Sequence, residues 1–445
     1  MAAVNLKQQK LVSALLDWFS ANARDLPWRR TRDPYAIWVS EIMLQQTQVT
    51  TVLPYWERWM RELPTIQAVA EASPDKIHKL WEGLGYYTRV RNLQKATRQI
   101  MEKHNGKFPD NFDDVLALPG IGRYTAGAIC SIAFNQPTPI LDANVIRVLT
   151  RIFSIGKNPR EKKTNAQLWR LAEELVAFAG GARLRRAQIS FAGDPATCKR
   201  SHGSTESRPT ENKNCSSLNQ SLMEFGALVC TPRQPQCPIC PVKKLCVAFR
   251  ENRVAELPNL GRRTAITVRR FIAFVIERNG KFLVQQRPAG VVNAHLWEFP
   301  NVEIGARLSE PQHARLQNTA GEIPVTDGTR TCCGSGDPRS EAVANAAMQT
   351  LGFTPKELTS LCTVKHSITR YRITLEAWRV KFGGASSARP HNTMGRRGTP
   401  PFEIGVWLSP AKLDSVALTG AHRKILERSN SKMTPPANGN RRCNA

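Results

Sequence analysis

The sequence FDDVLALPGIGRYTAGAICSIAF, residues 112–134, decides how the first half of the chain is expected to fold. Apolar residues recur at helical spacing on both sides of LPGIG at 118–122, which predicts two helices joined by a short turn. Gly120 and Gly122 allow the backbone of this turn to approach a ligand closely and to point N–H groups outward at the start of the second helix. Such a turn can bind a phosphate without reading a base, and an ordinary turn between helices is the alternative.

An aspartate follows the turn at the start of another predicted helix. In PILDAN, residues 139–144, Asp142 precedes the helical run Val145–Phe153 and is well placed to cap it. Capping alone would account for a single aspartate at this place, so the residue by itself does not decide between a structural and a chemical role.

A second carboxyl group of interest lies in WVSEIMLQQTQV, residues 38–49. Asp33-Pro34 predicts the start of a helix that is expected to run to about Gln45. Glu41, Gln45 and Gln48 lie at i, i+4 and i+7, which predicts a polar line on a helix whose other face is apolar. A carboxyl group in apolar surroundings tends to keep its proton, as a general acid must, whereas a solvated helix face is the alternative for a lone glutamate.

Four of the eleven cysteines are crowded into one short segment. They are separated by six, two and five residues, a spacing at which four thiolates can bind either tetrahedral zinc or a [4Fe–4S] cluster. The odd total and the single tight group indicate a reducing compartment and a metal site, not a set of disulfides. The four residues are Cys230, Cys237, Cys240 and Cys246.

The charge of the chain points to a polyanionic partner. Its 445 residues include 63 Lys and Arg against 36 Asp and Glu, for a net charge of +27. Such a field attracts nucleic acid, although a generally basic protein is the alternative. No apolar run reaches the roughly 18 residues of a membrane helix, and no secretory signal is expected at the N-terminus.

The hydrophobic period changes along the chain, which predicts several domains. Residues 1–182 have helical spacing, whereas from residue 266 the period is two, with a hairpin expected around the turn Arg278-Asn279-Gly280-Lys281 and a strand at Tyr371–Val380. The expected parts are a helical domain at 1–229 with an irregular insertion at 183–217, a cysteine loop at 230–246, a linker at 247–265, a mixed domain at 266–428 with an irregular insertion at 306–340, and a basic tail at 429–445.

These motifs together resemble the helix-hairpin-helix DNA glycosylase superfamily, and the stretch at 38–49 resembles the signature of its MutY-type adenine glycosylases. The resemblance implies that Glu41 protonates the adenine ring and that Asp142 supports the developing oxocarbenium ion. Relatives that also cut the backbone carry a lysine where this chain has Tyr124, so Tyr124 implies base removal alone. The resemblance also implies that Tyr124 is a residue of the catalytic site. Asn144 is implied to hydrogen-bond near the sugar or the base.

The same resemblance implies how the protein contacts DNA. Gln46 and Tyr86 correspond to residues that enter the base stack beside the extruded nucleotide. Gly120 and Gly122 correspond to the phosphate-binding hairpin. The four cysteines have the spacing of endonuclease III and MutY glycosylases, which selects the [4Fe–4S] cluster over zinc.

The C-terminal part resembles a Nudix-related domain at LWEFP, residues 296–300, and in the helix at 341–352. Nudix hydrolases hold magnesium with several glutamates on one helix, but this helix has no carboxylate after Glu341, so hydrolysis of nucleotides is not expected. In MutY-type proteins such a domain recognises 8-oxoguanine opposite the adenine. The matching loop is HSITRY at 366–371, with Thr369 and Arg370 in place of the family's serine and histidine.

The expected protein is a multidomain one: an all-α helix-hairpin-helix glycosylase with an iron–sulfur loop, followed by an α+β Nudix-like domain. It is expected to act as a monomer on duplex DNA containing A:8-oxoguanine or A:G mispairs, away from membranes. The expected location is the cytoplasm beside the nucleoid in a prokaryote, or the nucleus in a eukaryote.

Three other functions fit part of the sequence. An endonuclease III-like glycosylase with lyase activity is disfavoured by Tyr124, which cannot form an imine. A non-catalytic DNA-binding protein with a cluster is disfavoured by the presence of both Glu41 and Asp142. A nucleotide pyrophosphatase is disfavoured by the helix at 341–352.

Overall fold

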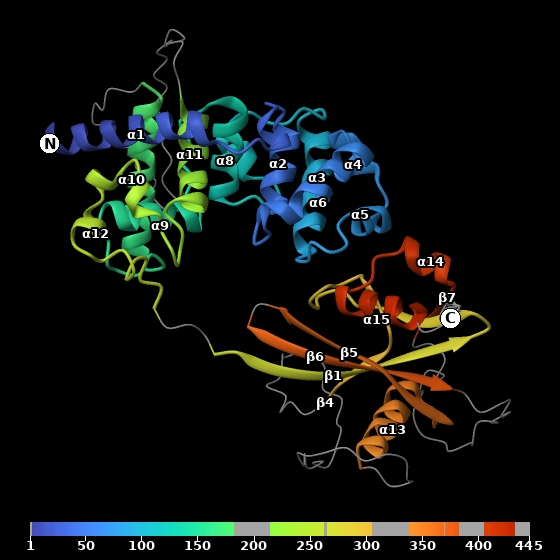
Figure 1. Ribbon diagram of the computed structural model, residues 1–445. Helices are drawn as coiled ribbons and strands as arrows, with labels where there is room; N and C mark the ends of the chain where they lie inside the picture. The colour runs from blue at the N-terminus through green and yellow to red at the C-terminus, as the bar shows by residue number, and fades with distance from the viewer. Residues whose placement is uncertain are drawn as a thin grey trace, which may run out of the picture. The chain divides into compact units, whose positions relative to one another are not determined.

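The chain forms two compact units in a computed structural model (Figure 1). The first unit comprises Met1–Ser73 and Thr88–Arg263, and the second comprises Pro74–Tyr87 and Thr264–Ala445. A short segment from the N-terminal half thus belongs with the C-terminal half. The residues that the structure describes are 2–181, 214–261, 265–304, 338–368, 370–381 and 405–431.

The first unit is helical throughout its described residues, in agreement with the helical period of the sequence. Short turns join most of its helices, so the chain reverses direction often and builds a layered bundle. The helices are α1 (Ala2–Asn22), α2 (Pro34–Leu44), α3 (Val49–Glu62), α4 (Ile66–Glu71), α6 (Thr88–Lys103), α7 (Phe112–Leu116), α8 (Arg123–Phe134), α9 (Ala143–Ile152), α10 (Lys162–Ala179), α11 (Cys215–Leu228) and α12 (Val247–Arg250), with 3-10 turns at Pro27–Arg29, Cys237–Ile239 and Lys243–Leu245.

Side-chain caps begin several of these helices where the sequence places them. The Asp33 carboxylate accepts from the backbone N–H groups of Tyr35 and Ala36 at 3.0 and 3.4 Å. Asp142 caps α9 by accepting from the Val145 N–H at 2.7 Å. Each cap satisfies a donor that the first turn of a helix leaves unpaired, and both predicted helix starts are confirmed.

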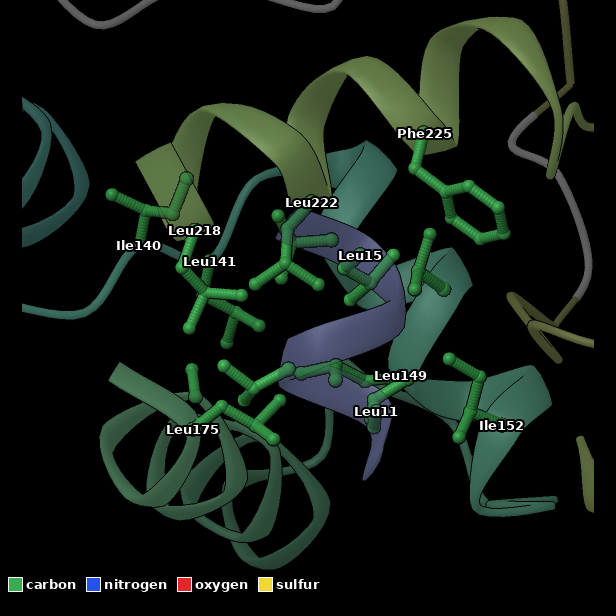
Figure 2. Packing of buried hydrophobic residues seen from close by; sticks show 14 of the residues in the cluster. Leu11, Leu15, Ile140, Leu141, Leu149, Ile152, Leu175, Leu218, Leu222 and Phe225 are labelled. Carbon is green, nitrogen blue, oxygen red and sulfur yellow. The ribbon is translucent and has the colours of Figure 1, made fainter. Parts of the chain in front are cut away.

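A cluster of buried side chains in the first unit joins α1, α9, α10 and α11. Leu15 of α1, Leu149 of α9 and Leu218 of α11 are each 0% exposed, and Figure 2 shows their side chains converging between the helices. Burying such side chains contributes about 1.5–3 kcal/mol each. This packing holds α9, which Asp142 caps, against α11.

One sequence expectation about the first unit was wrong. The polar line through Glu41, Gln45 and Gln48 does not lie on one helix, because α2 ends at Leu44 and α3 begins at Val49. Gln46 adopts a left-handed backbone with φ of 58°, which a continuing helix does not allow. A smaller difference is that α11 begins at Cys215, inside the stretch expected to be irregular.

The second unit contains a mixed sheet with the strand order β3-β2-β1-β6-β5, in which β4 also pairs with β1 and β7 with β2. β1 runs parallel to β6, with Phe271 opposite Leu375, and β6 runs antiparallel to β5. The elements are α5 (Pro74–Leu80), β1 (Thr267–Arg278), β2 (Lys281–Gln286), β3 (Trp297–Glu298), β4 (Asn301–Ile304), α13 (Pro338–Leu351), β5 (Glu357–Ile368), β6 (Tyr371–Lys381), β7 (Val406–Leu408), α14 (Pro410–Ser415) and α15 (Gly420–Ser431).

Helices cover both faces of this sheet. Side chains alternate between the faces of a strand, so Val275 of β1 packs with Ile425 of α15, whereas Phe274 packs with Val343 of α13. Figure 1 shows α13 on one face of the sheet and α15 on the other. The resulting α+β unit agrees with the fold class expected from the change of period.

The predicted β-hairpin is confirmed. β1 and β2 pair through Arg278 and Lys281, and the two central residues, Asn279 and Gly280, have φ of 51° and 70°. Positive φ at both positions is the requirement of a type I′ turn, which asparagine and glycine meet at low cost. Within the described residues no helix is long and apolar enough to cross a membrane.

Candidate active site and cysteine pocket

Glu41 is a buried carboxyl group near the end of α2. The residue is 6% exposed, and its Oε2 accepts a 2.8 Å hydrogen bond from the hydroxyl of Tyr124 on α8. Burial raises the pKa of Glu41 to about 7; the Tyr124 hydrogen bond and the charge of Arg29 oppose the rise, and the charge of Asp142 adds to it. Glu41 therefore keeps its proton into the neutral range, as a general acid must.

Among the described residues, the one hydrogen bond to the Glu41 carboxyl group comes from Tyr124. Burial raises the pKa of the Tyr124 phenol well above its usual value, and the nearby charges of Glu41 and Asp142 add to the effect. The phenol therefore remains a donor. Its oxygen also lies 3.4 Å from the Met223 sulfur, but the single proton is directed to the closer carboxylate.

Asp142 lies at the start of α9 with its carboxylate bound on both oxygens. Oδ1 accepts from the Val145 N–H at 2.7 Å, and Oδ2 accepts from the Asn144 amide at 2.8 Å. Burial raises the pKa of Asp142, while these hydrogen bonds and the charge of Arg147 oppose the rise. The carboxylate is thus held in one orientation by donors that favour its ionised form.

The structure brings Glu41 and Asp142 into one environment, where the charge of Asp142 raises the pKa of Glu41 and the charges of both raise the pKa of Tyr124. Burial raises the pKa of Glu41 to about 7. The ordinary pKa of Asp142 is lower, and hydrogen bonds from Val145 and Asn144 oppose the rise that burial causes in it. The hydrogen bonds to Asp142 favour its anion, whereas burial favours the protonated form of Glu41 up to a pKa of about 7. Two carboxyl groups with opposite protonation can cleave a glycosidic bond.

A buried arginine connects this site to the cysteine segment. Arg147, 7% exposed, donates from Nη2 to the Asn144 Oδ1 and to the Gly226 carbonyl, both at 2.8 Å, and from Nε to the Cys230 carbonyl at 2.7 Å. Hydrogen bonds therefore run without a break from Asp142 through Asn144 and Arg147 to the backbone of Cys230.

The four cysteines line one pocket together with Arg151 and Lys243. Two 3-10 turns, Cys237–Ile239 and Lys243–Leu245, fold the segment back on itself, and Arg151 Nη1 lies 3.4 Å from the Cys230 sulfur. As placed, the described residues include no group of three ligands close enough to hold a metal ion. The donor set, four thiols around one cavity with two cations, nonetheless fits a negatively charged thiolate-bound metal centre.

Comparison with known proteins places both units. Residues 39–174 match the HhH-GPD superfamily of base excision DNA repair proteins, and residues 272–428 match the NUDIX domain. The chain is 34% identical to the adenine DNA glycosylase of Buchnera aphidicola subsp. Schizaphis graminum over 66% of this chain and 76% of that protein. The chain belongs to the adenine DNA glycosylase family.

Mammalian members of the adenine DNA glycosylase family match over a longer alignment. The rat and human proteins are each 36% identical over 70% of this chain, which corresponds to 64% and 62% of their own lengths. The chain thus spans somewhat less than two thirds of these relatives.

Gln46 lies in the turn after α2, exposed and with a φ of 58°. Arg89 holds this turn by donating from Nη1 to the carbonyls of Ile42, Met43 and Gln45 at 2.8, 3.0 and 2.7 Å. These are carbonyls that the end of α2 leaves without helical partners. In this member of the adenine DNA glycosylase family, Arg89 therefore maintains a left-handed residue close in sequence to Glu41.

Tyr86 belongs to the second unit and is 42% exposed. Its φ of 47° follows Gly83 at 108° and Gly85 at 67°, so three positions of one loop have left-handed backbone. The Trp81 indole N–H donates to the Gly85 carbonyl at 3.0 Å and closes the loop. Thr369, the other residue of the second unit expected to contact DNA, lies outside the described residues.

Gly120 and Gly122 occupy the turn between α7 and α8 as expected. Gly120 has φ of 79°, and a Cβ there would lie 2.6 Å from the Asn92 Cβ. Gly122 precedes the first residue of α8, and a Cβ there would meet nothing within 4 Å. Gly120 is thus required by packing, whereas Gly122 leaves open space at a helix N-terminus.

The sequence did not single out a second buried carboxylate near Glu41. Glu224 of α11, 1% exposed, forms ion pairs with Arg24 at 2.7 Å and Arg29 at 3.0 Å. Burial would raise the pKa of Glu224, but hydrogen bonds from the two arginines outweigh it and lower the pKa to about 2. The charge of Arg29 also lowers the pKa of Glu41. Glu224 and its two arginines therefore belong to the electrostatic surroundings of the site.

Proposed function

We propose that the protein hydrolyses the N-glycosidic bond of adenine mispaired with 8-oxoguanine or guanine in duplex DNA and leaves an abasic site. The observation that supports this function most directly is the pairing of Glu41, whose pKa burial raises to about 7, with the hydrogen-bonded Asp142 in one environment. The activity named for the relatives agrees with it.

The proposed reaction begins with extrusion of the adenine nucleotide, because an acid cannot reach the base within the helix. Glu41 donates its proton to a ring nitrogen of adenine, which makes the base a leaving group. The bond between C1′ and that base breaks, its electron pair stays on adenine, and Asp142 stabilises the positive sugar. Water supplies the hydroxyl at C1′, and its proton returns to the carboxyl pair.

Tyr124 and Asn144 are proposed to position this pair. Tyr124 directs its proton to Glu41 at 2.8 Å, and Asn144 orients Asp142 at 2.8 Å. Since Tyr124 has no amine, it cannot form the imine that backbone cleavage requires. The proposed enzyme is therefore monofunctional.

The proposed contacts with DNA are distributed over both units. Gly120 and Gly122 would hold a phosphate at the start of α8. Gln46 and Tyr86 would enter the base stack, and the segment at 366–371 would read the base opposite adenine. Arg370 in that segment lies over the ring of Tyr371, 5.2 Å from its centroid, as an arginine does when it is fixed on an aromatic face.

We also propose that the four cysteines hold a [4Fe–4S] cluster. When bound, the cluster would cross-link the segment at 230–246 through four thiolates and so shape its surface, which carries Arg233, Lys243 and Lys244. Iron and acid-labile sulfide in the purified native protein, lost in a Cys237→Ser variant, are the expected result. Zinc in place of iron would contradict this proposal and leave the proposed glycosylase activity untouched.

The experiment that tests the function is single-turnover excision from duplexes with A opposite 8-oxoguanine, G or T, followed by alkali. Glu41→Gln and Asp142→Asn are expected to abolish excision while binding of the duplex is retained. Asp17→Asn, which alters an exposed carboxylate on α1, is the control and should be fully active. Turnover by either site variant would contradict the assignment, and strand cleavage before alkali would show a lyase.

A further inference from the structure

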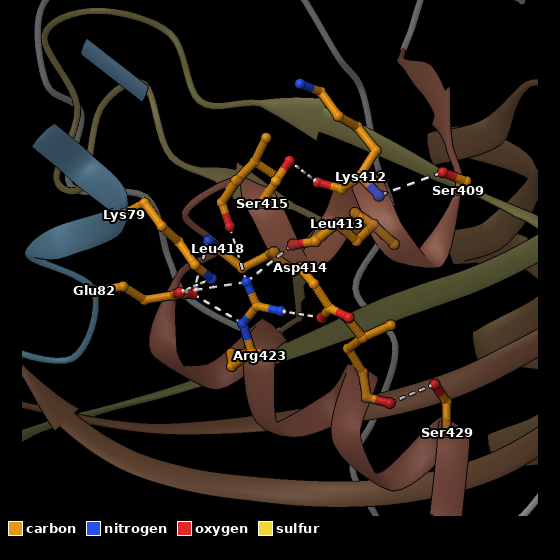
Figure 3. A network of polar contacts seen from close by, with 12 residues as sticks. Lys79, Glu82, Ser409, Lys412, Leu413, Asp414, Ser415, Leu418, Arg423 and Ser429 are labelled. Carbon is orange, nitrogen blue, oxygen red and sulfur yellow. Dashed lines mark hydrogen bonds and ion pairs between the residues drawn. The ribbon is translucent and has the colours of Figure 1, made fainter. Parts of the chain in front are cut away.

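The loop that carries Tyr86 is held to the C-terminal helices by Glu82. One carboxylate oxygen, Oε1, accepts from the backbone N–H of Leu418 at 3.1 Å and from Nε of Arg423 at 2.9 Å. The other, Oε2, accepts from Nη2 of Arg423 at 3.3 Å and from the Lys79 ammonium at 2.7 Å. Figure 3 shows Glu82 facing the Arg423 guanidinium, 341 positions away in the sequence.

The pair is shielded and its geometry is held from the Arg423 side. The side chains of Glu82 and Arg423 are 13% and 17% exposed. Arg423 also donates to the carbonyls of Leu413 and Val416 at 3.0 and 2.8 Å and lies 3.2 Å from the Asp414 carboxylate. A guanidinium with this many acceptors has little freedom, so it offers Glu82 a fixed partner.

On one side the contact leads to Tyr86. Glu82 and Tyr86 lie in the same short loop, which the hydrogen bond from Trp81 to Gly85 closes. Positive φ at Gly83, Gly85 and Tyr86 restricts the backbone between them. Holding Glu82 therefore limits where Tyr86 can lie.

On the other side the contact leads to β5, whose last residues belong to the segment at 366–371. Arg423 lies on α15, whose Arg428 donates to the Thr363 carbonyl of β5 at 3.0 Å. His422, the residue before Arg423, accepts from the Phe299 N–H at 3.0 Å. β5 ends at Ile368, within the segment at 366–371 that is proposed to read the base opposite adenine.

We propose that Glu82 is a positioning residue that fixes the Tyr86 loop to the body carrying the segment at 366–371. Tyr86 and the segment that reads the opposite base then keep a fixed position relative to each other. Recognition of 8-oxoguanine by that segment therefore promotes excision of the adenine. This inference rests on the proposed function. It gives a reason for Pro74–Tyr87 to belong with the second unit although the chain returns to the first at Thr88.

The test compares Glu82→Gln, Arg423→Gln and the double variant. We expect each single variant to lower the rate on A:8-oxoguanine by about tenfold, as for the loss of a charge-assisted hydrogen bond, and to change the rate on A:G far less. The double variant should lose no more than the single ones, because both remove the same contact. Glu357→Gln, which breaks the exposed pair with Lys381 at 2.9 Å in the same unit, is the matched control and should leave both rates unchanged.

A measurement independent of activity is hydrogen exchange at the Leu418 amide, whose N–H donates to Glu82. Exchange should be faster in Glu82→Ala than in the wild type or in Glu357→Gln. Unchanged exchange would overturn the contact, and faster exchange with an unchanged ratio of the two excision rates would overturn the positioning role. Wild-type protein that excises adenine from neither duplex would instead contradict the proposed function, so the two failures are distinguishable.

Discussion

The hydroxyl of Tyr124 donates a 2.8 Å hydrogen bond to the carboxylate of Glu41 across 83 positions of sequence. This hydrogen bond and the burial of Glu41 have opposite effects on the pKa of Glu41. Burial favours the neutral form of Glu41, whereas the hydrogen bond stabilises its anion, and the pKa of Glu41 is about 7 as a result. Burial outweighs this hydrogen bond, so the pKa of the proposed acid lies near neutral pH.

Excision should decline as the pH rises above about 7. The proposed reaction needs Glu41 protonated, and the fraction protonated falls as the pH passes its raised pKa of about 7. Single-turnover rates on an A:8-oxoguanine duplex between about pH 5 and pH 9 measure this, and a tenfold fall per pH unit is expected well above the pKa. A rate that stays constant to pH 9 would exclude Glu41 as the proton donor.

Replacement of Glu41 by Gln should stabilise the fold at pH 8. The folded-state pKa of Glu41 is raised from 4.5 to about 7, so the folded state holds a proton that the unfolded state has lost. Stability therefore falls as the pH rises from about 4.5 to about 7, by at most roughly 3 kcal/mol. Glu41→Gln removes this loss.

The measurement is urea unfolding of Glu41→Gln and wild type at pH 5 and pH 8. The difference between them should favour the variant more at pH 8, and Asp17→Asn should show no such dependence. Asp142, whose pKa burial also raises, contributes a loss of the same sign in both proteins.

Removal of the Tyr124 hydroxyl should shift the pH dependence of excision upward. Tyr124→Phe takes away the donor that lowers the pKa of Glu41, so the decline in rate should begin at higher pH than in the wild type. The rate below the decline should fall by about tenfold because the carboxyl group loses its orienting partner. A lower rate with an unshifted profile would mean that the phenol serves packing alone.

The local features of the fold could be predicted because they depend on neighbouring residues. Asp33 and Asp142 cap helices whose N–H donors lie two or three residues away. Asn279 and Gly280 make a type I′ turn because each tolerates positive φ. Glu41, Tyr124, Asp142 and Asn144 were singled out by resemblance, and the structure brings them together.

The parts that the sequence did not reveal depend on contacts between distant residues. Arg147 resembles any arginine on a helix until folding places it between Asn144 and Cys230. A glycine is needed at position 226 because a Cβ there would lie 2.7 Å from the Asn144 Cβ. The packing of α9 on α11 sets this close approach. The helical period also continues past Leu44, whereas Gln45, with ψ of 109°, and Gln46, with φ of 58°, leave the helical conformation.

Replacement of Arg147 by Gln should weaken both the fold and catalysis. The change removes the Arg147 donors to the carbonyls of Gly226 and Cys230 and frees Asn144, which orients Asp142. We expect a loss of about 2–4 kcal/mol in unfolding free energy and of about tenfold or more in the single-turnover rate.

The comparison that separates the two effects uses Arg147→Lys and a temperature at which all proteins are fully folded. The lysine can still reach one acceptor, so it should recover part of the rate. If both variants are less stable but excise at the wild-type rate, the contact from Arg147 to Asn144 has no role in orienting Asp142.

The two glycines of the turn before α8 should respond differently to alanine. At Gly120 a Cβ would lie 2.6 Å from the Asn92 Cβ in a backbone of positive φ, so two costs add. Gly120→Ala should lower the unfolding free energy by about 2 kcal/mol or more. At Gly122 a Cβ would meet nothing within 4 Å, and Gly122→Ala should cost less than about 1 kcal/mol.

Gly122→Ala, the variant expected to cost less stability, should be the one that weakens DNA binding. If the N–H groups at the start of α8 hold a phosphate, a methyl group at Gly122 stands where the phosphate approaches, and binding of the duplex should weaken by about tenfold in a stable protein. Equilibrium binding at fixed salt, measured beside urea unfolding for each variant, separates the effects because Gly122→Ala changes the first and not the second. Unaltered binding by Gly122→Ala would show that the turn only joins α7 to α8, since the open space beside Gly122 would then have no occupant in the complex.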